Sequence, residues 1–175
     1  MDARLYRLQG KAEFVTDLVP LLQAFHREKL SMLLRHQAGA RLVAQYDANN
    51  TYQYIINRED VQLSWLAVAL TELQASMPDA GGPERAPAGK GASVAQTIFA
   101  EDARDAQAFV DRWKPRVDAM PNARHAKMLR VILGETLEQK RFFEQALAGR
   151  TDLLGRRGDA VGARVGSVMS TRWIE

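Results

Sequence analysis

Apolar residues recur every three or four positions through four long stretches of this chain, and the alternation typical of a β-strand is almost absent. A recurrence of this period places the apolar side chains on one face of an α-helix. The stretches cover about 12–36, 52–77, 93–120 and 123–149. The sequence therefore predicts an all-α fold in which each of four long helices buries one face.

Glycines, prolines and capping residues divide these stretches. Gly39 is a reasonable stop for the first helix, and residues 40–46 can be read either as more helix or as an irregular connection. Residues 47–51 (Asp-Ala-Asn-Asn-Thr) supply several N-cap candidates for the second helix. Pro115, inside the third stretch, predicts a kink or an early end of that helix.

A segment rich in proline and glycine, about 78–92, separates the second and third helices. Its composition is typical of a flexible linker. Fourteen extended residues reach about 46 Å, roughly the length of a 30-residue helix. The linker can therefore cross from one end of a bundle to the other, although a disordered loop would have the same composition.

Composition excludes several classes of protein. The chain has 175 residues, which predicts one domain, and its net charge of +3 comes from acids and bases that are intermixed, unlike a nucleic-acid-binding surface. The absence of cysteine excludes disulfides and thiolate metal sites. We found no signal-peptide pattern and no apolar run long enough to span a membrane, so we expect a cytoplasmic protein. The expected bundle covers 1–149, and an extended tail covers 150–175.

Two helical segments resemble each other. Residues 59–66 read Glu-Asp-Val-Gln-Leu-Ser-Trp-Leu, and residues 136–143 read Thr-Leu-Glu-Gln-Lys-Arg-Phe-Phe. In both, a glutamine stands three residues before an aromatic residue and four before a large apolar one. The repeat indicates that the second and fourth helices occupy equivalent places in the fold.

Carboxylates on the apolar faces are the main candidates for a functional site. Glu28 and Glu59 fall on the faces of the first and second helices, where a carboxylate is costly to bury unless it is paired or bound to a metal. The two would be level if the intervening turn centres near residue 43 or 44. By the same reasoning, Asp105 and Asp102 are the acids of the third helix closest to the levels of Glu135 and Glu138.

Over about residues 12–149 the chain resembles the ferritin-like superfamily, in the broad rubrerythrin and bacterioferritin sense. In that family the first and third helices each give a Glu, and the second and fourth each give Glu-x-x-His, to hold two iron or manganese ions. The resemblance implies a long crossover between parallel second and third helices, and it places Gln62 and Gln139 where the family has histidines. The implied metal-site residues are Glu28, Glu59, Gln62, Asp102, Asp105, Glu135, Glu138 and Gln139.

Two interpretations of function follow. Because glutamine is a weaker ligand for iron than imidazole, the first is a degenerate, metal-free centre in a structural or protein-interaction module that is not an enzyme. The alternative is a carboxylate-rich dimetal protein that handles oxidation, peroxide or metal storage with two iron or manganese ions. An all-oxygen site would also suit manganese, magnesium or calcium.

The sequence also predicts the kind of partner and the positions of the three histidines. We expect a homo-oligomer, most simply a dimer, or a protein partner that binds through the tail at 150–175, and no nucleic acid. His26, His36 and His125 are expected on the surface or at helix ends, not as metal ligands.

Overall fold

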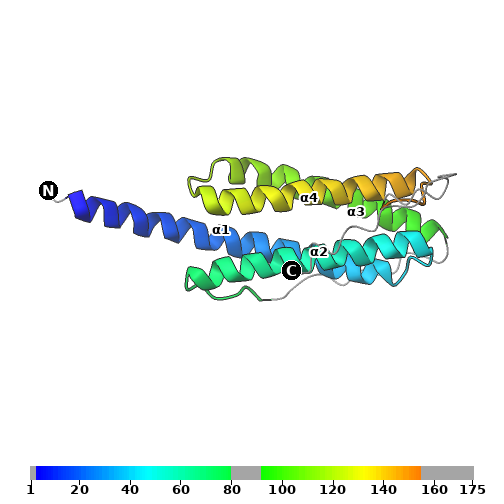
Figure 1. Cartoon of the computed structure of the whole chain (residues 1–175), viewed down its shortest axis with the longest axis horizontal. Helices are drawn as coiled ribbons and strands as arrows, with labels where there is room; N and C mark the ends of the chain where they lie inside the picture. The colour runs from blue at the N-terminus through cyan, green and yellow to red at the C-terminus, as the bar shows by residue number, and fades with distance from the viewer. Residues whose placement is uncertain (1–2, 80–91, 155–175) are drawn as a thin grey trace, which may run out of the picture.

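The computed structural model describes the backbone of residues 3–79 and 92–154, and the side chains of residues 18–79 and 93–154. Within those residues the chain forms four α-helices and no strand, which confirms the all-α, four-helix prediction (Figure 1). The helices are α1 (Ala3–Ala40), α2 (Tyr46–Glu72), α3 (Ala92–Asp118) and α4 (Ala123–Leu147). Most of the predicted linker at 78–92, and residues 155–175 of the predicted tail, lie outside the described residues.

The helix boundaries differ from the predicted ones mainly at α1 and α2. The α1 helix begins nine residues before the expected start, and α2 ends at Glu72, where the expected end was near Met77. The sequence left residues 40–46 open between helix and an irregular connection. In the structure α1 ends at Ala40, residues 41–45 form a short connection, and α2 begins at Tyr46. The N-cap of α2 is Gln45, ahead of the predicted candidates, and α3 continues through Pro115 for less than one further turn.

Contacts between the first and third helices define their relative direction. Trp113 Nε1 donates to Glu28 Oε2 over 2.7 Å, and Arg35 Nη1 donates to Asp105 Oδ2 over 2.6 Å. Because residue numbers fall along α3 as they rise along α1, these two helices are antiparallel.

The same relation holds between the second and fourth helices. Arg58 of α2 bonds to Glu135 of α4, and Glu72 of α2 pairs with Arg124 of α4 over 2.9 Å. These helices are therefore antiparallel as well, and they lie side by side in Figure 1.

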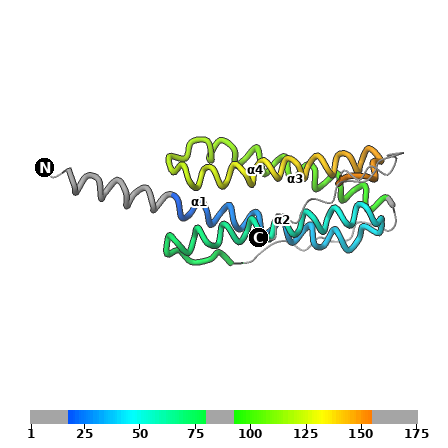
Figure 2. The backbone as a smooth tube through the Cα atoms, in the orientation of Figure 1, coloured from blue at the N-terminus to red at the C-terminus, as the bar shows by residue number. Residues whose placement is uncertain are grey.

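The direction of α3 relative to α2 follows from these pairs. The α1 helix is antiparallel to α2, to which it is joined by residues 41–45, and it is antiparallel to α3. The α2 and α3 helices are therefore parallel, and the end of α2 and the start of α3 lie at opposite ends of the bundle (Figure 2). Two antiparallel pairs, α1–α2 and α3–α4, thus face each other in two layers.

Aromatic side chains fill much of the space between the two layers. The ring of Phe25 on α1 lies 5.0 Å from Phe109 and 4.9 Å from Trp113 on α3, both in edge-on geometry. Tyr52 of α2 lies 5.4 Å from Phe143 of α4. The largest fully buried apolar and aromatic side chains are Leu22, Phe25, Met32, Tyr52, Ile55, Leu66, Leu70, Phe109, Trp113, Leu129 and Phe143.

We expect Leu129→Ala to lower the free energy of unfolding by about 2–5 kcal/mol, because the side chain is completely buried and its removal leaves a cavity. Leu137→Ala, on the same helix at an exposed position, is the matched control and should change it by no more than about 0.5 kcal/mol. Urea denaturation monitored by circular dichroism measures both. Equal losses in the two variants would contradict the described packing of α4.

Candidate functional site

One line of buried residues along α1 includes two polar side chains among apolar ones. Its members are Leu18, Leu22, Phe25, Lys29, Met32 and His36, all buried. Five steps cover 18 residues, which is 3.6 residues per step, the period of an α-helix. The helix therefore directs Lys29 and His36 into the core, where their side chains are 0% and 2% exposed.

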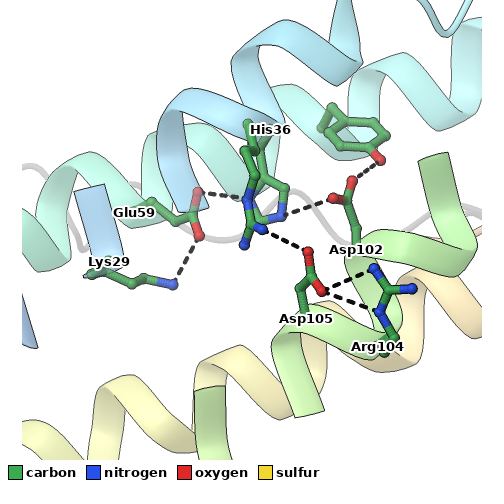
Figure 3. A network of polar contacts seen from close by, with 8 residues as sticks. Lys29, His36, Glu59, Asp102, Arg104 and Asp105 are labelled. Atoms are coloured by element: carbon green, nitrogen blue, oxygen red, sulfur yellow. Dashed lines mark hydrogen bonds and ion pairs between the residues drawn. The ribbon is translucent and has the colours of Figure 1, made fainter. Parts of the chain in front are cut away.

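Lys29 forms an ion pair with Glu59 in the centre of the bundle. The Lys29 Nζ atom donates to Glu59 Oε1 over 2.8 Å, and neither side chain has any exposed surface (Figure 3). The same ammonium lies 3.4 Å from Thr136 Oγ1 on α4, whose hydroxyl in turn donates to the Ile132 carbonyl. One cation thus bridges α1, α2 and α4.

His36 and Asp102 extend this pair into a network that reaches the third helix. His36 Nδ1 donates to the second oxygen of Glu59, Oε2, over 2.8 Å, since a carboxylate can only accept. His36 Nε2 lies 3.9 Å from Asp102 Oδ1 on α3. The hydroxyl of Tyr52 donates to Asp102 Oδ2 over 2.5 Å. We call Lys29, His36, Tyr52, Glu59, Asp102 and Thr136 the central network.

The surroundings of Glu59 hold its carboxyl group in the ionised form. Burial by itself raises the pKa of Glu59, because a charge is poorly solvated in the core. Attraction to His36 and Lys29 and the hydrogen bonds from both outweigh this effect and lower the pKa to about 2. Glu59 is therefore a charged residue in a dry environment, and its charge is balanced by other side chains of this protein.

The structure brings some of the predicted site residues to this centre. Glu59 and Asp102 belong to the central network, and Gln62 and Gln139 are buried at 0% and 3% exposure. Gln62 Nε2 donates to Glu135, while Gln62 Oε1 and both amide atoms of Gln139 have no hydrogen-bond partner among the residues that the structure describes. The repeated glutamines therefore do point inward.

Two of the predicted residues lie instead on the outer side of the α1–α3 contact. Glu28 is partly exposed and accepts hydrogen bonds from Arg112 and from Trp113. Asp105 is partly exposed and paired with Arg35. Both line a surface hollow between α1 and α3 and do not join the central network. The inward carboxylate expected from α1 is thus replaced by the neighbouring lysine.

The remaining two predicted residues, Glu135 and Glu138, line a groove between α2 and α4. Its other walls are formed by Tyr54, Arg58, Gln139 and Phe142, and its volume is about 250 Å³. Glu135 is held by Arg58 and Gln62, so its charge is already compensated.

The histidine expectation needs correction. His26, His36 and His125 are all buried, at 6%, 2% and 7% exposure, and His36 is central to the network. Burial lowers the pKa of His26 and of His125, the latter also because of Arg124. His125 does lie at a helix start, where its backbone N–H donates to the Asn122 side chain.

The donor set of this centre fits two metal ions poorly. Both oxygens of Glu59 are engaged by Lys29 and His36, and one oxygen of Asp102 accepts from Tyr52. A metal ion would also have to lie beside the Lys29 ammonium in a medium where like charges repel strongly. Over the described residues, no group of three or more His, Asp or Glu side chains has the geometry to hold a metal. Among the described residues, the amide oxygens of Gln62 and Gln139 have no hydrogen-bond partner, and they are oxygen donors that would favour a cation here.

Comparison with models of known protein families, with curated proteins and with solved structures gives no match. Among the helical residues that the structure describes, no helix is both long and apolar enough to cross a membrane.

The low pKa of Glu59 makes the stability of the protein depend on pH. A carboxyl group whose pKa is lower in the folded state than its ordinary value of 4.5 contributes stability above about pH 4.5, and this contribution is lost as the pH falls toward 2. We expect the loss to be on the order of 3 kcal/mol, and to be absent in Glu59→Gln. Urea denaturation from pH 7 downward measures the difference between the two proteins. A difference that stays constant below pH 4.5 would contradict the assigned pKa.

The ion pair should also appear as a strong energetic coupling. Lys29→Met leaves a buried carboxylate and Glu59→Gln leaves a buried ammonium, and each should cost about 3–5 kcal/mol of stability. The double variant should cost clearly less than the sum, because no unpaired charge remains. The same cycle on the exposed pair Lys114–Asp118 is the control and should show far weaker coupling. Additive costs for Lys29 and Glu59 would mean that the two charges do not meet.

Proposed function

We propose that this chain is a ferritin-like bundle whose centre has a protein cation in place of metal ions. We propose further that it acts as a structural and protein-interaction module and not as an enzyme. The observation that carries the proposal is the ion pair between Lys29 and Glu59, at 2.8 Å and without exposed surface on either side chain. The positive charge that balances the central carboxylate is supplied by α1 itself.

The helix directions support the ferritin-like part of the proposal. The α2 and α3 helices are parallel, with the end of α2 and the start of α3 at opposite ends of the bundle, and ferritin-like topology has the same relation between its second and third helices. Glu59 and Asp102 come from the second and third helices, which both give carboxylates in that family. Gln62 and Gln139 stand at its histidine positions and are buried.

The burial of the central network supports the non-catalytic part. Lys29, His36, Glu59 and Asp102 are 0–2% exposed, so a substrate has no contact with them in this arrangement. Catalysis at metal ions also needs open coordination positions that substrate can reach. A network of this kind stabilises one packing of the helices and leaves the outer faces for binding.

The alternative is a dimetal carboxylate protein with two iron or manganese ions, and one observation favours it. His36 lies between the carboxylates of Glu59 and Asp102, a combination of ligand types that iron and manganese accept. This alternative requires the Lys29 ammonium to leave the centre.

Elemental analysis of the full chain purified without chelators separates the two. We expect iron and manganese well below one ion per chain in the wild type, because Lys29 already neutralises Glu59. Glu59→Ala is analysed in parallel, and Glu28→Ala, at the outer α1–α3 contact, is the control. Stoichiometric metal in the wild type and in Glu28→Ala that disappears in Glu59→Ala would overturn the metal-free proposal.

A further inference from the structure

Exposed large apolar side chains are distributed unevenly over the bundle. Among the described side chains, those that belong to helices come only from α2 and α4, and none comes from α1 or α3. On α2 they are Tyr46, Tyr54, Val61 and Val68, and on α4 they are Val131 and Leu137. A concentration of apolar surface on one side of a protein marks an interaction site more often than scattered single residues do.

Three of these side chains form one line along α2. Tyr54, Val61 and Val68 follow at intervals of seven residues, with 45%, 38% and 56% of their surfaces exposed. Seven residues make nearly two helical turns, so the three share one side of the helix. Trp65, partly buried, lies beside them under the guanidinium of Arg58.

The line on α2 continues onto α4. Tyr54 meets Phe142 in edge-on geometry at 6.1 Å, and Arg58 bonds to Glu135. Val131 lies one turn from Glu135 on the same side of α4, whereas Leu137, two residues after Glu135, is rotated away by roughly 200°. We call the surface formed by Tyr54, Val61, Trp65, Val68, Val131 and Phe142 the α2–α4 face.

We propose that the α2–α4 face binds a second copy of this chain and forms a twofold-symmetric dimer. The α2 helix has 27 residues, so two adjacent helices of about this length present roughly 40 Å by 20 Å, or about 800 Å². A stable interface of standard size buries about 800 Å² on each partner. The face is therefore large enough for a dimer without any further contribution.

The charges on the face favour a second copy over a strongly acidic or basic partner. Arg58 is paired with Glu135, and Arg124 with Glu72, both across α2 and α4 within one subunit. Glu138 and Arg141, also on α4, line one hollow and have opposite signs. A face whose charges cancel in this way is compatible with its own image, because a twofold axis brings the same patch against itself.

The groove between α2 and α4 opens on this face and can accept a side chain from the second copy. Its volume is about 250 Å³, and the unpartnered amide of Gln139 lines it. A polar atom from the second copy would satisfy that amide, and exclusion of water from the groove would add specificity to the apolar contact. This inference rests on the proposed interaction role and does not depend on whether the centre is free of metal.

Sedimentation equilibrium of the full chain over a wide micromolar range tests the proposal. We expect the wild type to have the mass of two chains. Val61→Glu should raise the dissociation constant at least about tenfold, because it places an unpaired carboxylate in the centre of the face. Leu137→Glu introduces the same charge at a similarly exposed position outside the face, and this variant should remain dimeric. Circular dichroism confirms that both variants are folded.

Cross-linking locates the contact independently, because the chain has no cysteine. Val61→Cys should give covalent dimers with a bifunctional thiol reagent, and Leu137→Cys should not. A monomeric wild type, or a dimer that Val61→Glu leaves intact, would overturn the inference and leave this face to a different protein or to another part of this chain. The metal analysis is unaffected by either result, so failure of the dimer and failure of the metal-free centre are recognised separately.

Discussion

The arrangement of the bundle depends on two opposite charges that are kept together away from water. Lys29 on α1 and Glu59 on α2 are both completely buried, and either one without the other would be an uncompensated charge in the core. Their contact restricts how far α1 can slide along α2. His36 also contacts Asp102 on α3, and the Lys29 ammonium also contacts Thr136 on α4, so the positions of these two helices are restricted as well. A network of a few polar side chains thus gives all four helices one common register.

The apolar packing and the central network both join the α1–α2 layer to the α3–α4 layer. Phe25, Phe109 and Trp113 form an aromatic cluster on one side of the Lys29 ammonium, which lies 5.7 Å from the centre of the Phe109 ring. Tyr52 packs against Phe143 and also donates to Asp102, so one side chain serves both kinds of contact. The apolar contacts supply most of the driving force for association, and the polar contacts select one alignment.

The sequence was sufficient to predict four helices, the inward position of Glu59 and the level of its partner on α1. The predicted partner was Glu28, whereas the residue that contacts Glu59 in the structure is the next one, Lys29. Spacings of three and four are both helical, so the face of α1 can be followed through Leu21 and Glu28 or through Leu22 and Lys29, and only packing distinguishes the two phases. An unbroken step of 3.6 residues from Leu18 to His36 was the available signal. It includes a lysine and a histidine, which are residue types not usually assigned to a core.

The parallel course of α2 and α3 has a consequence for the order in which the chain can fold. Each antiparallel pair is local in sequence, since α1 and α2 are joined by five residues and α3 and α4 by four. Local pairs form quickly because they close short loops. In the isolated α1–α2 hairpin, Lys29 and Glu59 would meet while still in contact with solvent, where an ion pair costs little. The two charges would then lose their contact with water only when α3 and α4 dock, so the cost of dehydrating them belongs to the pairing of the two layers and not to the formation of the hairpin.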